Sequence, residues 1–452
     1  MKIIVAGAGK IGFTITQYLT REGHEVTIID RNQDRITLVN STLDVFSIAG
    51  SVDAELLKLA GVETADLLIA ATNSDETNIL CCMMGRKLGV EHTIARVRRQ
   101  DHYNTVMLLR EELGLSMTIN PDYDTAAEIS RVLRFPSAAK VEPFAKGQAE
   151  LVEFRLGENN PLCGMALKNY HSRFDRGTLI CAVRRGDQVH IPSGDFVLQA
   201  GDSVNVVGSS KHIHSFFRAM AIFKKGARNV MVVGGGQVGV YLGRQLLGMG
   251  IRVTIVEKEP DKARAAKELL PKAEVICADG SRPDVLEDEG LRGMDALVAV
   301  TGTDEINIIL GAYARNAGVG KAIAKVNEDH LLALAESFGL EASVQPRYIT
   351  AQQVLQYVRS MDNASSSSGV EMLRRILDGK LEVLEFRASV ASPCIGVPLR
   401  TLRIRPDVLV AAIIRDGKCL IPGGNDEIWA GDSVLAVTTK TGMTRLEDIL
   451  RG

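Results

Sequence analysis

The sequence is an internal duplication, and this feature constrains the fold more than any other. Residues 1 to about 224 and about 225 to 452 match each other segment by segment, in the same order. One half opens with KIIVAGAGKIGFTITQYLTREGHEVTIIDRN and the other with NVMVVGGGQVGVYLGRQLLGMGIRVTIVEKE. Further along, ATNSDETNI matches VTGTDEINI, and IARVR matches IAKVN. A duplication of this length predicts that each folded unit of the first half has a counterpart in the second.

Each half begins with strands and helices in alternation. An apolar strand, a glycine turn, a helix with apolar spacing and a second β-branched strand follow one another. This order predicts an α/β fold with a parallel, doubly wound sheet of the Rossmann type. Behind it, EFRL and IPSGDFVLQAGDSVNVVG in the first half match EFRA and IPGGNDEIWAGDSVLAVT in the second. These short, turn-rich segments predict a small α+β domain in each half.

We therefore expect four domains in tandem. Segments near residues 136–147 and 363–369 are expected to connect the two kinds of domain, with the four serines at 365–368 as a flexible linker. The expected boundaries are 1–136 and 225–364 for the nucleotide-binding domains, and 137–224 and 365–452 for the small domains.

Composition argues against several classes of protein. Of 452 residues, 46% are hydrophobic and 24% charged, and the formal net charge of −2 lacks the basic excess of a nucleic-acid-binding protein. Seven cysteines without metal-ligand spacing favour reduced thiols in a cytosolic protein. The most apolar stretch, residues 230–251, is broken by glycines and Arg244, which predicts strand, turn and helix rather than a membrane span. We find no export signal and expect a cytoplasmic chain.

The glycine turns carry the strongest functional signal. Gly7, Gly9 and Gly12 form G-x-G-x-x-G between a strand and a helix, and Asp30 ends the next strand. In such motifs the first glycine permits the turn, the second lets a pyrophosphate approach, the third allows close helix packing, and the acid accepts bonds from ribose. The second half repeats the pattern with the same spacing. The candidate nucleotide-binding residues of the two turns are Gly7, Gly9, Lys10, Ile11, Gly12 and Asp30, and Gly234, Gly236, Gln237, Val238, Gly239 and Glu257.

The two acids also bear on which nucleotide is bound. They favour NAD-type or adenine nucleotides over NADP, because a 2′-phosphate would meet a carboxylate. Arg31 and Lys258, which follow the acids, weaken that exclusion. We expect NAD(H), with ATP or ADP as the alternative.

Basic side chains follow a later strand of the first half. Arg96 and Arg98 lie two apart on this predicted strand, so both can project from one face toward bound phosphates. Their counterparts are Lys325 and Asn327, so the first site would hold a diphosphate more strongly and the two sites would be unequal. The alternative is a solvated charge pair on an edge strand.

Polar side chains follow the preceding strand of each half, where doubly wound sheets bind ligands. Their alternative role is to cap the helix that comes next, which needs only a Thr, Asp or Asn at its start. These candidates are Thr72, Asn73 and Asp75 in the first half, and Thr301 and Asp304 in the second.

Catalytic machinery is missing from the patterns. None of the eight histidines recurs in both halves, and we interpret His24, His92, His102 and His190 as surface or packed residues. H-E-x-x-H, C-x-x-C, G-x-S-x-G and a Walker-type lysine loop are all absent from the sequence. We therefore expect no enzyme activity. The main alternative is an NAD-dependent oxidoreductase, because a Rossmann domain followed by a smaller domain is also the plan of many dehydrogenases.

These features together resemble the RCK (KTN) family of regulatory domains. The resemblance rests on GAGKIG and GGGQVG, the acids Asp30 and Glu257, ATNSDETN, IARVR and the two AGDSV segments, and it covers nearly the whole chain. It implies NAD(H) or ATP/ADP binding in the N-type domains and a ring, here a homotetramer. The ring would lie at the cytoplasmic face of the membrane and gate a potassium-translocating membrane subunit. Alternative partners are an antiporter or another cation channel, and in some relatives the C-type domains bind regulators such as cyclic di-AMP.

One departure from the family pattern concerns the third strand. Many relatives have Gly-Asp after it, whereas this chain has Gly50-Ser51 in the first half and Asp279-Gly280 in the second. The resemblance therefore adds Asp279 to the candidate nucleotide contacts and leaves the adenine side of the first site undefined.

Overall fold

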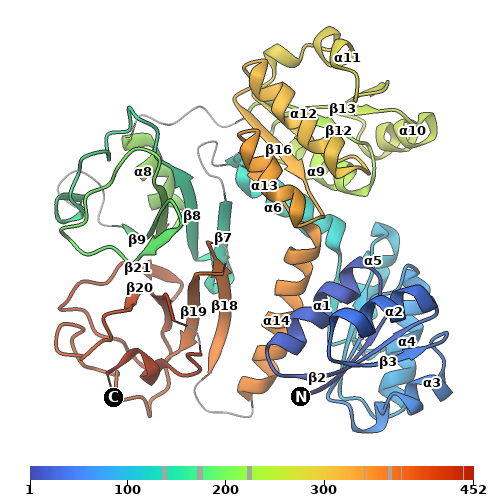
Figure 1. The fold of residues 1–452 in the computed structure, drawn as a ribbon, viewed down its shortest axis with the longest axis horizontal. Helices are drawn as coiled ribbons and strands as arrows, with labels where there is room; N and C mark the ends of the chain where they lie inside the picture. The colour runs from blue at the N-terminus through green and yellow to red at the C-terminus, as the bar shows by residue number, and fades with distance from the viewer. Residues whose placement is uncertain are drawn as a thin grey trace.

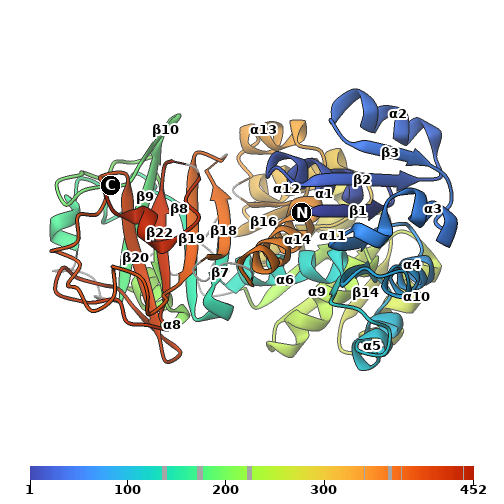
Figure 2. The ribbon, with the colours of Figure 1, turned by 90° about the horizontal axis from the view of Figure 1, so that it is seen from below.

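The computed structural model describes most of the chain. The described residues are 1–134, 140–170, 177–220, 227–340, 342–364, 369–377, 379–440 and 442–451. Two sheets with helices on both faces lie on one side of the molecule, and two smaller sheets lie on the other (Figures 1 and 2). None of the helices in these ranges combines the length and the apolar character needed to span a membrane.

The first large sheet is six-stranded and parallel, with the order β3-β2-β1-β4-β5-β6. Its central strands are buried on both faces, as their unbroken apolar runs predict. The strands are β1 (Lys2–Ala6), β2 (Glu25–Asp30), β3 (Phe46–Ala49), β4 (Leu67–Ala70), β5 (His92–Arg96) and β6 (Met117–Ile119). The helices are α1 (Lys10–Arg21), α2 (Gln33–Thr42), α3 (Ala54–Leu59), α4 (Asp75–Lys87) and α5 (Gln100–Leu108).

The second large sheet repeats this order as β14-β13-β12-β15-β16-β17, again all parallel. The doubly wound fold is therefore confirmed twice, and the apolar stretch 230–251 forms a strand, a turn and a helix as predicted. The strands are β12 (Asn229–Val233), β13 (Arg252–Glu257), β14 (Glu274–Cys277), β15 (Ala296–Ala299), β16 (Lys321–Lys325) and β17 (Ala342–Val344). The helices are α9 (Gln237–Gly248), α10 (Pro260–Leu269), α11 (Pro283–Asp288), α12 (Asp304–Asn316) and α13 (His330–Ser337).

Two long helices cross between the halves. α6 (Pro121–Arg134) follows the first large sheet but packs on α9 of the second, and α14 (Pro346–Ala364) follows the second sheet but packs on α1 of the first. Ile129 of α6 lies in one core with Val232 and Leu242, and Val358 of α14 lies in one core with Ile15. Each half thus completes the core of the other.

The two small sheets are five-stranded and antiparallel, which confirms the expected second kind of unit. The first has the order β10-β9-β11-β8-β7, and the second β18-β19-β22-β20-β21. Their elements are β7 (Lys140–Phe144), β8 (Ala149–Arg155), β9 (Thr178–Arg185), β10 (Gln188–His190), β11 (Ser203–Gly208) and α8 (Ser210–Ala219), then β18 (Val370–Ile376), β19 (Leu381–Arg387), β20 (Val408–Arg415), β21 (Lys418–Leu420) and β22 (Ser433–Thr438).

The structure corrects one expected connection. Lys140–Phe144, placed in a connecting segment by the sequence, is strand β7, and it pairs with β8 in an antiparallel ladder. Residues 135–139 and the expected serine linker at 365–368 lie outside the described residues. The domain boundaries themselves stay a prediction.

The matching EFR and AGDSV segments are explained by contacts that recur in both small sheets. Arg185 binds Asp202, and Arg415 binds Asp432, each through two hydrogen bonds of 2.7 to 2.9 Å. Next to each aspartate, a serine donates to the glutamate of the EFR segment on the adjacent strand. These repeated residues therefore hold strands together and close turns.

Candidate functional site

The first glycine turn joins β1 to α1. Two of its glycines are required by the fold, and the third has open space beside it. Gly7 has φ +109°, and a Cβ there would lie 2.9 Å from the backbone of Ala71 and Thr72. At Gly12 a Cβ would lie 1.8 Å from the carbonyl oxygen of Gly7. At Gly9, by contrast, the only described atom within 4 Å would be Nη1 of Arg35, at 3.8 Å. The protein itself requires glycine at positions 7 and 12 and leaves space beside Gly9.

Asp30 stabilises this turn. Its buried carboxylate accepts hydrogen bonds from the backbone N–H of Ala8 (2.7 Å) and of Asn32 (2.8 Å), and Arg35 Nη1 lies 3.4 Å away. A carboxylate has about four acceptor positions, so further acceptor capacity remains for ribose hydroxyls. Arg31, next to it, is exposed.

The second glycine turn has the same geometry. Gly234 has φ +116°, and a Cβ at Gly239 would lie 2.0 Å from the carbonyl oxygen of Gly234. No described atom lies within 4 Å of a Cβ built at Gly236. Glu257 is buried and accepts the N–H groups of Gly235 (2.6 Å) and Glu259 (2.9 Å). The two turns present equivalent openings to a phosphate at the start of α1 and α9.

The remaining turn residues differ in their surroundings. Ile11 and Val238 are buried and belong to the cores under their helices. Lys10 is exposed and reaches across to the second half, where its Nζ lies 3.1 Å from Oε1 of Glu328. Gln237, its counterpart, is exposed at the start of α9.

The loops after β4 and β15 are held by an asparagine that the sequence analysis missed. Asn78 Oδ1 accepts from the N–H and the hydroxyl of Thr72 (2.8 and 2.6 Å), and its Nδ2 donates to the carbonyl of Arg96 (2.9 Å). Asn307 repeats all of these bonds with Thr301 and the Lys325 carbonyl. An identical position in both copies was the signal that could have identified this pair.

Helix capping does not explain the candidates after β4. The side chain of Ser74, rather than that of Thr72, Asn73 or Asp75, caps α4. Asp75 instead accepts the backbone N–H groups of Arg98 and Arg99, and its counterpart Asp304 accepts those of Asn327 and Glu328. The aspartates thus tie the loop after β5 or β16 to the preceding loop.

The alternative of a solvated edge-strand charge pair for the two arginines is wrong. β5 has β4 and β6 as neighbours, and Arg98 lies beyond the end of the strand. Arg96 Nη1 donates to the Thr72 carbonyl (3.3 Å), while Nε is buried without a hydrogen-bond partner among the described residues. Burial, with a contribution from Arg98, lowers the pKa of Arg96 to about 10. Arg98 Nη2 donates to the carbonyl of Asn73 (2.8 Å).

The second half is less basic at the same place. Burial lowers the pKa of Lys325. Asn327 turns its side-chain amide to Asp304, 2.8 Å away. Two guanidinium groups thus bind the loop after β4, whereas the second half has one ammonium group and one amide at the equivalent positions.

Asp279 lies at the tip of the loop after β14. It is exposed and accepts hydrogen bonds from the N–H and the hydroxyl of Ser281. The Ser281 hydroxyl is the main cause that lowers the pKa of Asp279. A Cβ at the following residue, Gly280, would lie 2.6 Å from the side chain of Val233. In the first half, Gly50 donates its N–H to the carbonyl of Asp30.

Groups for acid–base chemistry are sparse around both openings. His102 is the nearest histidine to the candidates, with Nδ1 3.5 Å from Asp75 Oδ2. The equivalent position in the second half is Leu331, and His330 precedes it at the start of α13. Within the described ranges, no three His, Cys, Asp or Glu residues are grouped as a metal site would need. The arrangement is suited to binding a nucleotide through backbone N–H groups, carboxylates and basic side chains.

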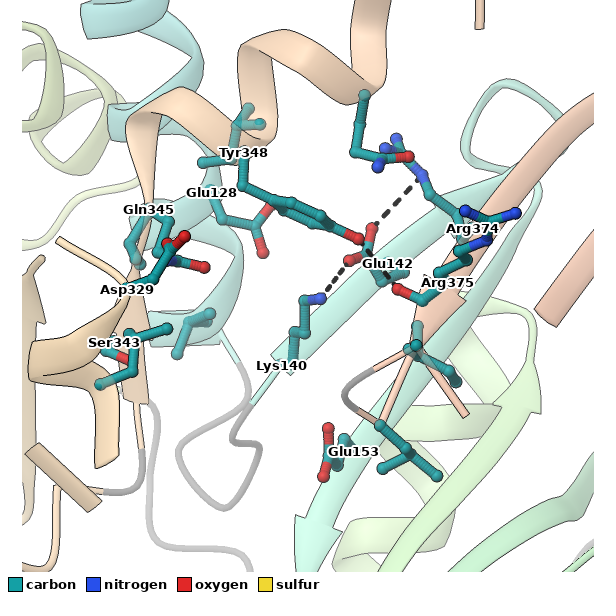
Figure 3. A pocket seen from close by; sticks show the side chains of 18 of the residues that line it. Glu128, Lys140, Glu142, Glu153, Asp329, Ser343, Gln345, Tyr348, Arg374 and Arg375 are labelled. Atoms are coloured by element: carbon teal, nitrogen blue, oxygen red, sulfur yellow. Dashed lines mark hydrogen bonds and ion pairs between the residues drawn. The ribbon is translucent and has the colours of Figure 1, made fainter. Parts of the chain in front are cut away.

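A separate cleft of about 2040 Å³ lies between the large and the small sheets. Figure 3 shows Glu128 of α6, Lys140 and Glu142 of β7, Tyr348 of α14 and Arg374 of β18 pointing toward one another in it. The cleft thus lies where the crossing helices α6 and α14 meet β7 and β18, the edge strands of the two small sheets.

Comparison with known families covers both kinds of unit. The TrkA-N domain model matches residues 3–121 and 230–346, and the TrkA-C domain model matches residues 151–221 and 383–451. The Trk system potassium uptake protein TrkA of Azorhizobium caulinodans is 29% identical over 462 residues, covering 100% of this chain and 99% of that protein. A TrkA homolog of Archaeoglobus fulgidus is 29% identical over 453 residues, with 100% of both chains covered.

Solved structures show the same fold at low sequence identity. The GsuK RCK domain superposes with a TM-score of 0.64 at 16% identity, covering 96% of this chain and 92% of that one. A GsuK channel bound to NAD has a TM-score of 0.64 at 17% identity, covering 97% of this chain and 76% of that one. Because two TrkA-N and two TrkA-C matches together span most of its length, the chain belongs to the TrkA-N/TrkA-C family.

Proposed function

We propose that this chain is a nucleotide-sensing regulatory subunit of a Trk-type potassium uptake system and that it is not an enzyme. The observation that carries the proposal is the pair of glycine turns, each braced by a buried acid and each open beside its second glycine. The full-length relatives are named as Trk potassium uptake proteins, which supports a membrane potassium-translocating subunit as the partner.

The proposed ligands are NAD(H), with ATP or ADP as the alternative. A related fold is described as bound to NAD, and another as bound to ADP with a TM-score of 0.51. The two arginines at the first opening favour a diphosphate there. For the second site, Lys325, Asp279 and the glycine turn are the proposed contacts. An oxidoreductase would need a proton donor against the nicotinamide, whereas His102 is paired with Asp75 and is replaced by Leu331 at the equivalent place in the second half.

Regulation would follow from the helices that cross between the halves. α1 and α9 start at the two glycine turns and pack on α14 and α6, which lead into the small sheets. A nucleotide that binds one arrangement of these helices more tightly shifts the population toward it, and an attached pore would respond to the difference. No covalent step is required.

We further propose that the chain assembles as a homotetramer on the cytoplasmic face of the membrane. Leu80 of α4 and Ile309 of α12 occupy equivalent positions and are 56% and 62% exposed, respectively. Paired apolar positions on the outside of both large units are suited to repeated contacts in a symmetric ring.

The proposal is tested by calorimetric titration of the protein with NADH, NAD, ATP and ADP, repeated with Asp30→Ala and Glu257→Ala. Binding that each substitution weakens, without oxidation of NADH in the presence of 2-oxo acids, is the expected result. Turnover of NADH would establish the oxidoreductase instead. Failure of all four nucleotides to bind would remove the nucleotide-sensing role.

A further inference from the structure

A tyrosine of the second large unit contacts the phosphate-side loop of the first. Tyr241 lies on α9, the helix that begins at the second glycine turn, and is 5% exposed. Its hydroxyl donates a hydrogen bond to the carbonyl oxygen of Arg98 (2.8 Å) and accepts one from Asn120 Nδ2 (3.1 Å). Asn120 Nδ2 also lies 3.2 Å from the same carbonyl oxygen.

Both backbone groups of Arg98 are therefore fixed, the N–H by the first unit and the carbonyl by side chains of both units. Asp75 of the first unit accepts its N–H at 3.0 Å, and Tyr241 of the second unit binds its carbonyl. The guanidinium group then extends from this clamped backbone to the loop after β4. The Tyr241 ring also packs edge-on against Tyr123 of α6, with ring centroids 5.6 Å apart.

The second unit makes this contact with the first, and the residues at the equivalent positions bond elsewhere. The position equivalent to Tyr241 in α1 is Thr14, whose hydroxyl donates to the carbonyl of Lys10 in its own helix. The position equivalent to Asn120 is Gln345, whose amide donates to Asp329. Thr14 and Gln345 are thus engaged elsewhere, in place of the two side-chain bonds that Tyr241 and Asn120 make to the Arg98 carbonyl.

We propose that Tyr241 is a positioning residue for the first nucleotide site, supplied by the second unit. It fixes the backbone from which Arg98 reaches the phosphates, and it lies two turns or less from the glycine turn of the second site. Occupancy of the second site, by shifting α9, changes the placement of Arg98 at the first. This inference rests on the proposed nucleotide binding.

The test is ADP titration of Tyr241→Phe in a chain whose second site is blocked by Gly236→Val. No described atom lies within 4 Å of a Cβ built at Gly236, and Phe keeps the aromatic ring that packs on Tyr123. Loss of one buried hydrogen bond predicts about fivefold weaker ADP binding at the first site. Adenosine, which has no phosphate, should bind as before.

Three controls separate positioning from general damage. Thr14→Val removes the equivalent hydroxyl of α1 and should leave ADP binding unchanged. With the first site blocked by Gly9→Val, Tyr241→Phe should not alter ADP binding at the second. Hydrogen exchange at the amides of Arg98 and Arg99 should speed up in Tyr241→Phe, because the loop loses its outer anchor.

The outcomes distinguish the inference from the function on which it rests. Parent protein that binds ADP while Tyr241→Phe binds it equally well would overturn the inference alone. Equal weakening of ADP and adenosine would show a structural role and would also overturn it. Absence of ADP binding in the parent would overturn the proposed function, and the inference with it.

Discussion

Individual glycines in the two turns have separable roles. Gly7 and Gly12 are required by the protein's own backbone, because a Cβ at either would overlap neighbouring main-chain atoms. Gly9 and Gly236 have ordinary negative φ values and no comparable overlap, so the fold alone would accept a side chain at both. The proposed nucleotide, approaching the backbone closely, would account for glycine at these two positions.

This difference predicts that glycine-to-alanine substitution affects stability at position 12 and ligand binding at position 9. Gly12→Ala should destabilise the protein by about 1 to 3 kcal/mol through overpacking, measured by urea unfolding. Gly9→Ala should leave the unfolding midpoint near that of the parent and should weaken ADP binding at the first site. A large loss of stability in Gly9→Ala would show that its glycine also serves the fold.

At the scale of elements, the crossing helix α6 carries buried acids where it meets α14 and β7. Burial raises the pKa of Asp124 to about 6. Burial also raises the pKa of Glu128 to about 7, opposed by Arg131 and increased by the charge of Glu142. Although burial alone would raise it, Lys140 and Arg374 lower the pKa of Glu142 to about 2. The junction between large and small sheets therefore combines an acid whose pKa is lowered by neighbouring cations with two acids whose pKa values are raised toward neutrality.

The raised pKa of Glu128 predicts pH-dependent stability. Its unfolded pKa is near 4.3, so the folded chain binds more protons between pH 4 and 7, and this contribution to stability is lost as the pH rises through that window. Glu128→Gln, with a neutral side chain, should reduce the difference in unfolding free energy between pH 5 and pH 8 by on the order of 2 kcal/mol. The exposed Glu158 provides the control substitution, Glu158→Gln. An unchanged pH dependence in Glu128→Gln would contradict the assignment.

At the scale of the whole molecule, the two halves of the chain pack on each other through both their large and their small units. The large units exchange α6 and α14, and the small sheets share a core in which Phe144 and Leu151 lie with Leu381 and Leu435. These contacts leave exposed apolar side chains on helices of both large units, including Leu80, Leu108 and Ile309, and on Phe338 directly after α13. Further association should therefore use those outer faces.

Charge introduced at these faces should break the assembly without unfolding the chain. In sedimentation experiments, Leu80→Lys combined with Ile309→Lys should shift the protein from the proposed tetramer toward smaller species. Leu38 of α2 is similarly exposed, at 54%, and Leu38→Lys should leave the mass unchanged. Full-size assemblies of the double variant would exclude this interface.

The duplication could be predicted by comparing the two halves of the sequence directly. The two glycine turns and the acids at the ends of β2 and β13 could be predicted because they depend on residues close together in sequence. Local backbone geometry requires glycine at position 7, and the spacing to Asp30 follows from one strand, one helix and one strand. The brace of Asn78 could have been predicted from its recurrence as Asn307, since both occupy one place in the repeat.

The pairing of the halves was decided only in three dimensions. The apolar face of α6 shows that the helix must be buried, but hydrophobic contact is not directional and does not specify which sheet buries it. β7 was missed because its charged Lys140 and Glu142 are neutralised by each other and by groups distant in sequence, such as Arg374. Tyr241 also gave no signal in the sequence, because its hydroxyl meets the Arg98 carbonyl only after α6 has brought the two halves together.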